Sequence, residues 1–195
     1  MSVVSLTQAN LKISTFADYL AYDDGTDRRY ELTYGDLIEV PPESDENVLI
    51  SRALDRALSE MVGFQRVRTH QLAIEVLGQP KNRFPDLTVL RPEHLEQLQT
   101  LGQSAITLAM APPLVVVEVV SPGAESRRRD YFDKRNQYEW RGIPEYWIVD
   151  PQVGCVTVLA MADGRYTETV FNSGDTVVSP TFPQWQLTVE EMLRS

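Results

Sequence analysis

The stretch that decides the fold is Leu114–Pro122, which reads LVVVEVVSP. An apolar run this short and this rich in valine predicts a strand buried on both faces, in the middle of a sheet. One acid, Glu118, interrupts the run. A buried carboxylate without a partner is costly, so it either takes up a proton or lies against a cation. Glu118 is therefore the first candidate for a functional residue.

A second acid stands at the edge of another apolar strand. The segment Phe84–Leu90 predicts a short strand that carries Pro85-Asp86 near its start. If this strand lies beside the one with Glu118, both carboxylates can reach one cation. Carboxylate oxygens suit hard cations such as Mg²⁺ or Mn²⁺. The chain has only two histidines and one cysteine, which argues against a zinc site of the usual His/Cys kind.

A simpler alternative stays open for each acid. An acid in a strand can cap a sheet edge or pair with a nearby Arg or Lys, and Pro-Asp is a common turn. The predicted strand Glu145–Val149 ends at Asp150-Pro151. Proline restricts the residue before it to extended geometry, so we expect Asp150 to cap a turn rather than to bind a metal.

A basic helix follows the Glu118 strand after a short link. The segment Arg127–Trp140 predicts this helix, and Asp130, Lys134 and Tyr138 share one of its faces because they are spaced four residues apart. Lys134 can reach over the end of the strand, where it would hold an attacking water or offset negative charge on a phosphate. An exposed Asp130–Lys134 ion pair is the alternative.

Other cations are weaker candidates. Arg127, Arg128 and Arg129 could contact DNA phosphates, although a run of arginines at a helix start is most often solvated. Lys81 precedes Asp86 by five residues and is expected to lie in a solvated loop.

The remaining elements complete a mixed α/β pattern. We expect a helix from Thr15, a hairpin of two strands, a helix ended by Gly63, a long strand, a segment that is helix or loop, a second hairpin and a short helix from Thr188. The two strands of the first hairpin are Arg29–Thr33 and Leu37–Val40, and the helix that Gly63 ends is Ile50–Met61. The long strand is Arg66–Leu77, and the helix or loop is Pro92–Leu101. The second hairpin consists of Val156–Met161 and Tyr166–Phe171. This order predicts one domain over residues 1–195, with a mixed central sheet, flanking helices and a loose tail at residues 1–12.

Composition limits the class of protein. A net charge of −10 and a pI of about 4.7 argue against a protein that coats DNA through general electrostatics. The single cysteine excludes an internal disulfide and fits a reducing compartment. Residues 1–11 lack a secretory signal, and no apolar run is long enough for a membrane span. We therefore expect a cytoplasmic protein.

Several motifs in one order resemble a large bacterial family of restriction endonucleases, long filed as a domain of unknown function and abundant in photosynthetic bacteria. The motifs are Tyr30-Glu31-Leu32, Pro85-Asp86, Leu114–Pro122, Arg128-Arg129-Asp130, Lys134, Tyr138, and Gly142–Pro151, which reads GIPEYWIVDP. The similarity extends from about Phe16 to about Leu193. It places the chain in the PD-(D/E)XK restriction-endonuclease-like superfamily, whose core is a mixed sheet flanked by helices.

The resemblance also implies roles for individual residues. Asp86 and Glu118 would bind Mg²⁺ or Mn²⁺, and Glu31 would be an additional acid. The usual lysine position, two residues after the second acid, is Val120 here, so Lys134 of the following helix would take that role, with Tyr138 supporting it. Many members carry a histidine where this chain has Asn47, which puts full activity in doubt.

Three functions are compatible with these observations. The leading hypothesis is a metal-dependent endonuclease that hydrolyses phosphodiester bonds in DNA, and a homodimer would suit cleavage of both strands. The first alternative is a weak or inactive nuclease fold that acts as an interaction or nucleic-acid-sensing module. The second is a metal-dependent hydrolase of a small phosphorylated substrate.

Overall fold

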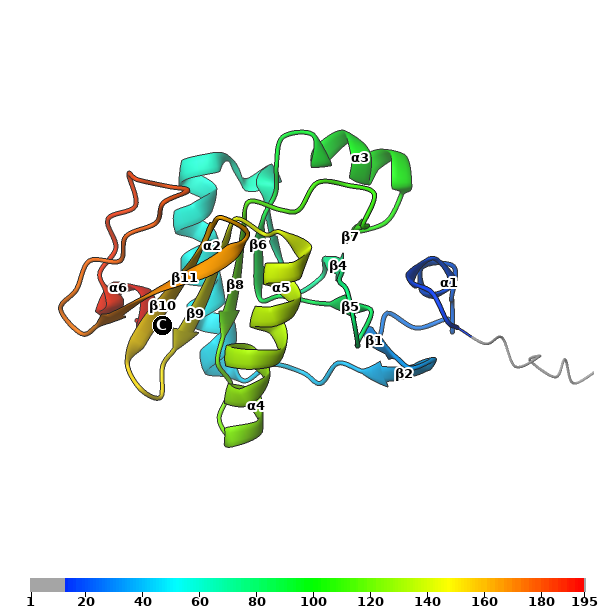
Figure 1. The fold of residues 1–195 in the computed structure, drawn as a ribbon, viewed down its shortest axis with the longest axis horizontal. Coiled ribbons are helices and arrows are strands. Elements are labelled where there is room, and N and C mark those ends of the chain that lie inside the picture. Colours follow the sequence, from blue (N-terminus) through cyan, green and yellow to red (C-terminus); the bar gives the residue numbers. More distant parts are fainter. Residues whose placement is uncertain (1–12, 195) are drawn as a thin grey trace, which may run out of the picture.

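A six-stranded mixed sheet forms the centre of the molecule, in a computed structural model that describes residues 13–194. Its strands in spatial order are β11 (Arg165–Asn172), β10 (Cys155–Ala162), β9 (Glu145–Asp150), β8 (Val115–Val119), β6 (Leu87–Val89) and β3 (Val67–Thr69). Only β8 and β9 run parallel; every other neighbouring pair is antiparallel. Helices lie on both sides of this sheet (Figure 1), so the predicted mixed sheet with flanking helices is confirmed.

The valine-rich strand β8 is central, as its composition predicts. Its neighbours are β6 on one side and β9 on the other. Alternate residues point to opposite faces of a strand, and β8 obeys this rule. Val115, Val117 and Val119 join one hydrophobic cluster, whereas Val116 and Val120 join another. Both faces of the strand are therefore buried.

Helix α2 (Asp45–Val62) covers one face of the sheet. It begins at the N-cap Ser44, whose hydroxyl accepts the Asn47 N–H, and it ends at Gly63, which has a φ of 88°. Ile50, Leu54 and Leu58 recur every four residues and are fully buried against the sheet.

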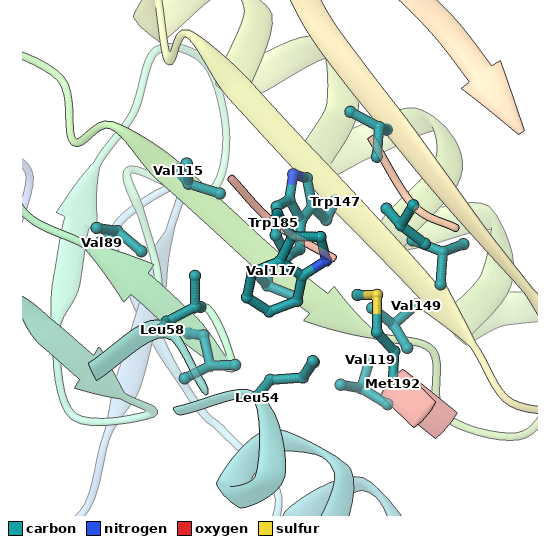
Figure 2. Packing of buried hydrophobic residues seen from close by; sticks show 14 of the residues in the cluster. Leu54, Leu58, Val89, Val115, Val117, Val119, Trp147, Val149, Trp185 and Met192 are labelled. Carbon is teal, nitrogen blue, oxygen red and sulfur yellow. The ribbon is translucent and has the colours of Figure 1, made fainter. Parts of the chain in front are cut away.

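Two tryptophans and a short helix complete this first cluster. The rings of Trp147 and Trp185 meet edge to face at 5.0 Å, and both lie over Val117 in Figure 2. Helix α6 (Val189–Leu193) contributes Met192, also shown in Figure 2, and packs beside α2. Its capping box at Thr188 and Glu191 is the one that the sequence predicts.

A second helical layer covers the opposite face. It consists of α4 (Ala124–Arg128), a π-helical segment (Arg129–Lys134) and α5 (Arg135–Arg141), which continue one another. The layer starts three residues before the predicted helix, and its middle turn is wider than an α-helical turn. Tyr138 packs from this layer against the sheet cluster that contains Val116.

Smaller sheets flank the central one. The predicted hairpin is formed by β1 (Tyr30–Thr33) and β2 (Asp36–Glu39), with a turn of two residues, one fewer than the predicted strands leave. β4 (Ala73–Glu75) pairs with β5 (Asn82–Arg83) and with β7 (Ala105–Ile106). The Asn82 side chain joins the two sheets, because it accepts the Leu32 N–H and donates to the Tyr30 carbonyl, both at 2.9 Å.

Two strand predictions are wrong. The expected strand Arg66–Leu77 is split: β3 belongs to the central sheet and β4 to the small sheet, with a 3₁₀ turn at Phe64–Arg66 before them. The break comes at His70, whose φ of 40° cannot continue a strand. The expected strand Phe84–Leu90 is shortened to β6, because its first residues connect the two sheets.

The remaining helices are short. They are α1 (Phe16–Leu20), capped by Thr15 as predicted, and α3 (His94–Leu101), which resolves the helix-or-loop alternative for Pro92–Leu101. None of the helices over residues 13–194 is long and apolar enough to cross a membrane. The predicted tail at residues 1–12 lies outside the described residues.

Truncation of one core side chain tests the packing of α2. We expect Leu54→Ala to lower the free energy of unfolding by about 2–5 kcal/mol, because Leu54 is fully buried in the first cluster. Leu49→Ala, in the same helix at a side chain that is 40% exposed, should change it by about 0.5 kcal/mol or less. Urea denaturation of both variants measures the difference, and equal effects would contradict the packing described.

Candidate active site

A cleft of about 480 Å³ opens where β6 begins and β8 ends. Its charged lining residues are five acids and two cations: Glu31, Glu39, Glu43, Asp86 and Glu118, with Arg129 and Lys134. This excess of carboxylates favours a bound cation, since like charges in one cleft repel. The donor chemistry therefore fits a divalent metal ion.

Strand pairing brings Asp86 and Glu118 to the same cleft. β6 and β8 are antiparallel, with Leu87 opposite Val117. Asp86 precedes Leu87 and Glu118 follows Val117, so the same register sets the two acids opposite one another and toward the same face. Asp86 also accepts the Val119 N–H at 2.5 Å. The two acids thus lie on neighbouring segments, at one edge of the paired region.

Lys134 and Tyr138 engage Glu118 from the helical layer. The Lys134 Nζ lies 2.7 Å from one Glu118 oxygen, and the Tyr138 hydroxyl donates to the other at 2.6 Å. Lys134 also lies 2.9 Å from Asp130. The expected alternative of an exposed Asp130–Lys134 pair is wrong, because both side chains are more than nine-tenths buried. One ammonium therefore joins two acids inside the protein.

Burial dominates the electrostatics of this cluster. Burial is the main cause that raises the pKa of Glu118 to about 8; the nearby Asp86 and Asp130 also raise it, and Lys134 opposes them. Burial lowers the pKa of Lys134, but Glu118 and Asp130 outweigh that effect and the net pKa is raised. Lys134 thus keeps its charge at neutral pH.

The π-helical segment sets the position of Lys134. Asp130 and Lys134 both lie within Arg129–Lys134, where the backbone makes a wider turn than an α-helix. The Tyr146 hydroxyl, from β9, donates to the Asp130 carbonyl at 3.0 Å. This bond attaches the widened turn to the sheet below it. Turns of this kind are frequent at functional sites.

Asp86 lies in a second group, with Glu43 and His70. One potential ligand atom of each residue lies within 4.8 Å of the other two. The His70 Nδ1 is 3.3 Å from Asp86 but makes no well-oriented hydrogen bond. Arg29 donates to the His70 carbonyl at 2.6 Å, which helps to hold the left-handed backbone that turns this residue away from β3. Glu118 is not part of this group.

Glu31 lines the cleft from β1 and is held by buried partners. Arg83 donates to Glu31 at 2.8 Å and to Gln137 at 2.7 Å. Gln137 in turn donates to the Leu77 and Pro80 carbonyls, both at 3.0 Å. This chain connects the hairpin, β5 and α5, so Glu31 has a fixed place at the cleft wall.

Asn47, in helix α2, binds the end of β8 through its side chain. Its side-chain nitrogen donates to the Val119 carbonyl and to the Ser121 hydroxyl, both at 3.0 Å. The residue is fully buried and is not among those that line the cleft. Its side-chain oxygen has no partner among the described residues. In this chain Asn47 therefore positions β8.

The three arginines have different surroundings. Arg127 pairs with the buried Asp150 at 2.7 Å, and Arg128 pairs with Asp133 at the surface at 3.1 Å. Only Arg129 lines the cleft. Asp150 also accepts the N–H groups of Gln152 and Val153 at 3.2 and 3.3 Å, so it caps the turn after β9.

Sequence reasoning missed three residues of the site. Glu43 stands in a proline-rich link, where no periodicity draws attention to it. His70 sits in a segment that alternates like a strand, although it is one of only two histidines in the chain. Asp130, by contrast, lies on the helix face that its spacing predicts, and an exposed pair with Lys134 was the alternative. Arg83, which binds Glu31, differs from other residues of the sequence only by its charge, which does not predict a role in the site.

The pKa of Glu118 predicts how stability depends on pH. A carboxyl whose pKa rises from 4.5 to about 8 on folding binds a proton more tightly in the folded protein. Its contribution to stability therefore falls as pH rises through that interval. Glutamine carries no charge at any pH. We expect the melting temperature of metal-free Glu118→Gln, relative to wild type, to be higher at about pH 8 than at about pH 5.

Glu125→Gln removes an exposed acid at the start of α4 and serves as the control, with a difference that stays nearly constant across this range. A sharp loss of stability for Glu118→Gln at both pH values would identify Glu118 as an ion-pair partner that the fold requires.

Comparisons with known proteins agree with this architecture. The fold is similar to a solved structure described as a "putative nuclease belonging to DUF820" from Anabaena variabilis ATCC 29413, with a TM-score of 0.63. The two chains are 18% identical, and the match covers 92% of this chain and 97% of the other. At this identity the likeness shows a shared fold. No curated protein matches the chain.

A family profile confirms the resemblance that the motifs indicate. The profile is that of Uma2, with the description "Putative restriction endonuclease", and it matches residues 16–190. The matched region includes every residue of the cleft described above. The chain belongs to the Uma2 family.

Proposed function

We propose that the protein is a metal-dependent endonuclease that hydrolyses phosphodiester bonds in DNA. The observation that carries the proposal is the buried Lys134 ammonium, held between Glu118 and Asp130 in a cleft that also contains Asp86. A lysine beside a group of carboxylates is the combination that hydrolysis of a phosphodiester requires: ligands for a cation and a fixed positive charge. Family membership supports the same reaction class.

Asp86 and Glu118 would hold Mg²⁺ or Mn²⁺. Each Glu118 oxygen has one partner and two lone pairs, so it can accept a cation as well. Such an ion, when bound, polarises a phosphate oxygen and lowers the pKa of a bound water. Lys134 orients the attacking water and offsets the negative charge that develops on the phosphate. Tyr138 keeps Glu118 in place beneath it.

Arg129 is the best placed cation for a DNA phosphate, because it lines the cleft from the start of the π-helical segment. Glu31, which also lines the cleft and is fixed by Arg83, would bind the ion through water or orient a second water. Arg128 lies nearby on the surface. A long DNA backbone would meet few further cations, in keeping with the net charge of −10.

A second function is favoured by two observations. Acids outnumber cations in the cleft, and the position where many members carry histidine is the buried Asn47. Both fit a weak or inactive nuclease fold that serves as an interaction or nucleic-acid-sensing module. Cleavage of supercoiled DNA, single-stranded DNA and RNA, assayed in parallel with Mg²⁺ or Mn²⁺, separates the two functions.

Replacement of Lys134 tests the proposed reaction. We expect Lys134→Met to lower the rate of DNA cleavage by about 100-fold or more, because a preorganised charge at the phosphate is lost. Metal binding, measured by calorimetry, should persist, since Lys134 is not a ligand. Lys81→Met removes a lysine that does not line the cleft and should cleave like wild type.

Lys134→Met leaves two buried acids without a cation, so Lys134→Arg provides a folded variant that keeps the charge but changes its geometry. Its melting temperature should stay close to that of wild type while cleavage falls. Full cleavage by Lys134→Met, or by Asp86→Asn, would refute the proposed mechanism.

A further inference from the structure

His70 and Glu43 form, with Asp86, the least satisfied polar group of the cleft region. The Nδ1 of His70 is buried and has no hydrogen-bond partner. Within residues 13–194, the Glu43 carboxylate makes neither a hydrogen bond nor an ion pair, although it lines the cleft and burial raises its pKa. Buried polar groups are normally satisfied. The unpartnered His70 nitrogen, beside the carboxylates of Glu43 and Asp86, therefore indicates a bound ligand.

The spacing of these groups suits a single metal ion. With bonds of about 2.1 Å, neighbouring ligands of an octahedral ion are about 3.0 Å apart and opposite ligands about 4.2 Å. His70 Nδ1 and Asp86 Oδ1 are 3.3 Å apart, and all three ligand atoms lie within 4.8 Å of one another. Glu118, the second ligand proposed above, is not part of this group of three and is held by Lys134 and Tyr138.

The geometry points to His70 as a nitrogen ligand of the cleft's metal ion, together with Glu43 and Asp86, so that the site selects Mn²⁺ over Mg²⁺. This inference rests on the proposed function, because it concerns the ion of the same cleft. Mg²⁺ prefers oxygen ligands and keeps several waters, whereas imidazole suits transition metals. A site with one imidazole and two carboxylates therefore discriminates in favour of the transition ion.

The backbone at His70 is arranged for this role. Its φ of 40° lies in the left-handed region, where His, Asn and Asp are enriched among residues other than glycine. Arg29 holds the His70 carbonyl at 2.6 Å, and the His70 N–H donates to the Asp86 carbonyl at 3.2 Å. The same residue thus breaks the strand and directs its ring toward Asp86.

Mn²⁺ itself is the probe for a nitrogen ligand. In pulsed electron paramagnetic resonance of the full chain with bound Mn²⁺, we expect spin-echo modulation from an imidazole nitrogen. His70→Asn tolerates the same backbone and should abolish that modulation. The other histidine of the chain, His94, is bonded to Arg91 and Ala111 and remains in both proteins, so it controls for unspecific coupling.

Calorimetry with each ion measures the selectivity. Wild type should bind Mn²⁺ more tightly than Mg²⁺, and His70→Asn should weaken Mn²⁺ binding by about tenfold or more while changing Mg²⁺ binding much less. Glu43→Gln should weaken both ions. Glu125→Gln removes an exposed acid that does not line the cleft and should bind both ions like wild type.

Wild-type Mn²⁺ spectra without nitrogen modulation would overturn the inference, and this measurement needs no variant to fold. An unchanged ratio of Mn²⁺ to Mg²⁺ affinity in folded His70→Asn would overturn it as well. DNA cleavage, assayed separately, tests the proposed function: cleavage without modulation refutes only the His70 ligand, and modulation without cleavage refutes only the nuclease.

Discussion

One ammonium group, the Nζ of Lys134, holds together the acids on which the site depends. It contacts Glu118 at 2.7 Å and Asp130 at 2.9 Å, and all three side chains are more than nine-tenths buried. Without that charge, two carboxylates would face one another between the sheet and the helical layer, at a high desolvation cost. The contact therefore ties the middle of β8 to the π-helical segment. The position of the helical layer over the sheet, and of Tyr138 within it, follows from the same constraint.

The backbone of Val119, at the end of β8, is the second fixed point. The Val119 N–H is bound by Asp86 and its carbonyl by Asn47, so one residue is held from the cleft and from helix α2. Glu118 precedes this residue directly. The cleft thus has two halves around β8: a cationic half with Lys134, and a half with Asp86, Glu43 and His70. Glu118, which Lys134 binds, belongs to the first half, and the other proposed metal ligands belong to the second.

Much of this arrangement could be predicted from the sequence, because local patterns determine it. Five consecutive strand residues of β8 are apolar apart from Glu118, and that pattern alone indicates a central strand. Spacing of four residues places Lys134 on the face of Asp130. His70 and Glu43 could not be found in this way. The strand break at His70 depends on Arg29, about forty residues earlier in the chain, and Glu43 reaches the cleft through a proline-rich link without periodicity. Contacts between residues that are far apart in the chain produce no periodic pattern in the sequence.

The widened turn in the helical layer has a consequence for how this chain is compared with others. An α-helix advances by about 100° per residue around its axis, so one extra residue in an ordinary turn would rotate everything beyond it by that angle. A widened turn takes up one residue without that rotation, so a relative with an ordinary α-helical turn keeps its lysine on the same side of the helix only if its spacing is one residue shorter. Alignment of the acids alone is therefore a poor guide to the cation; the number of residues between Asp130 and Tyr138 must be matched first.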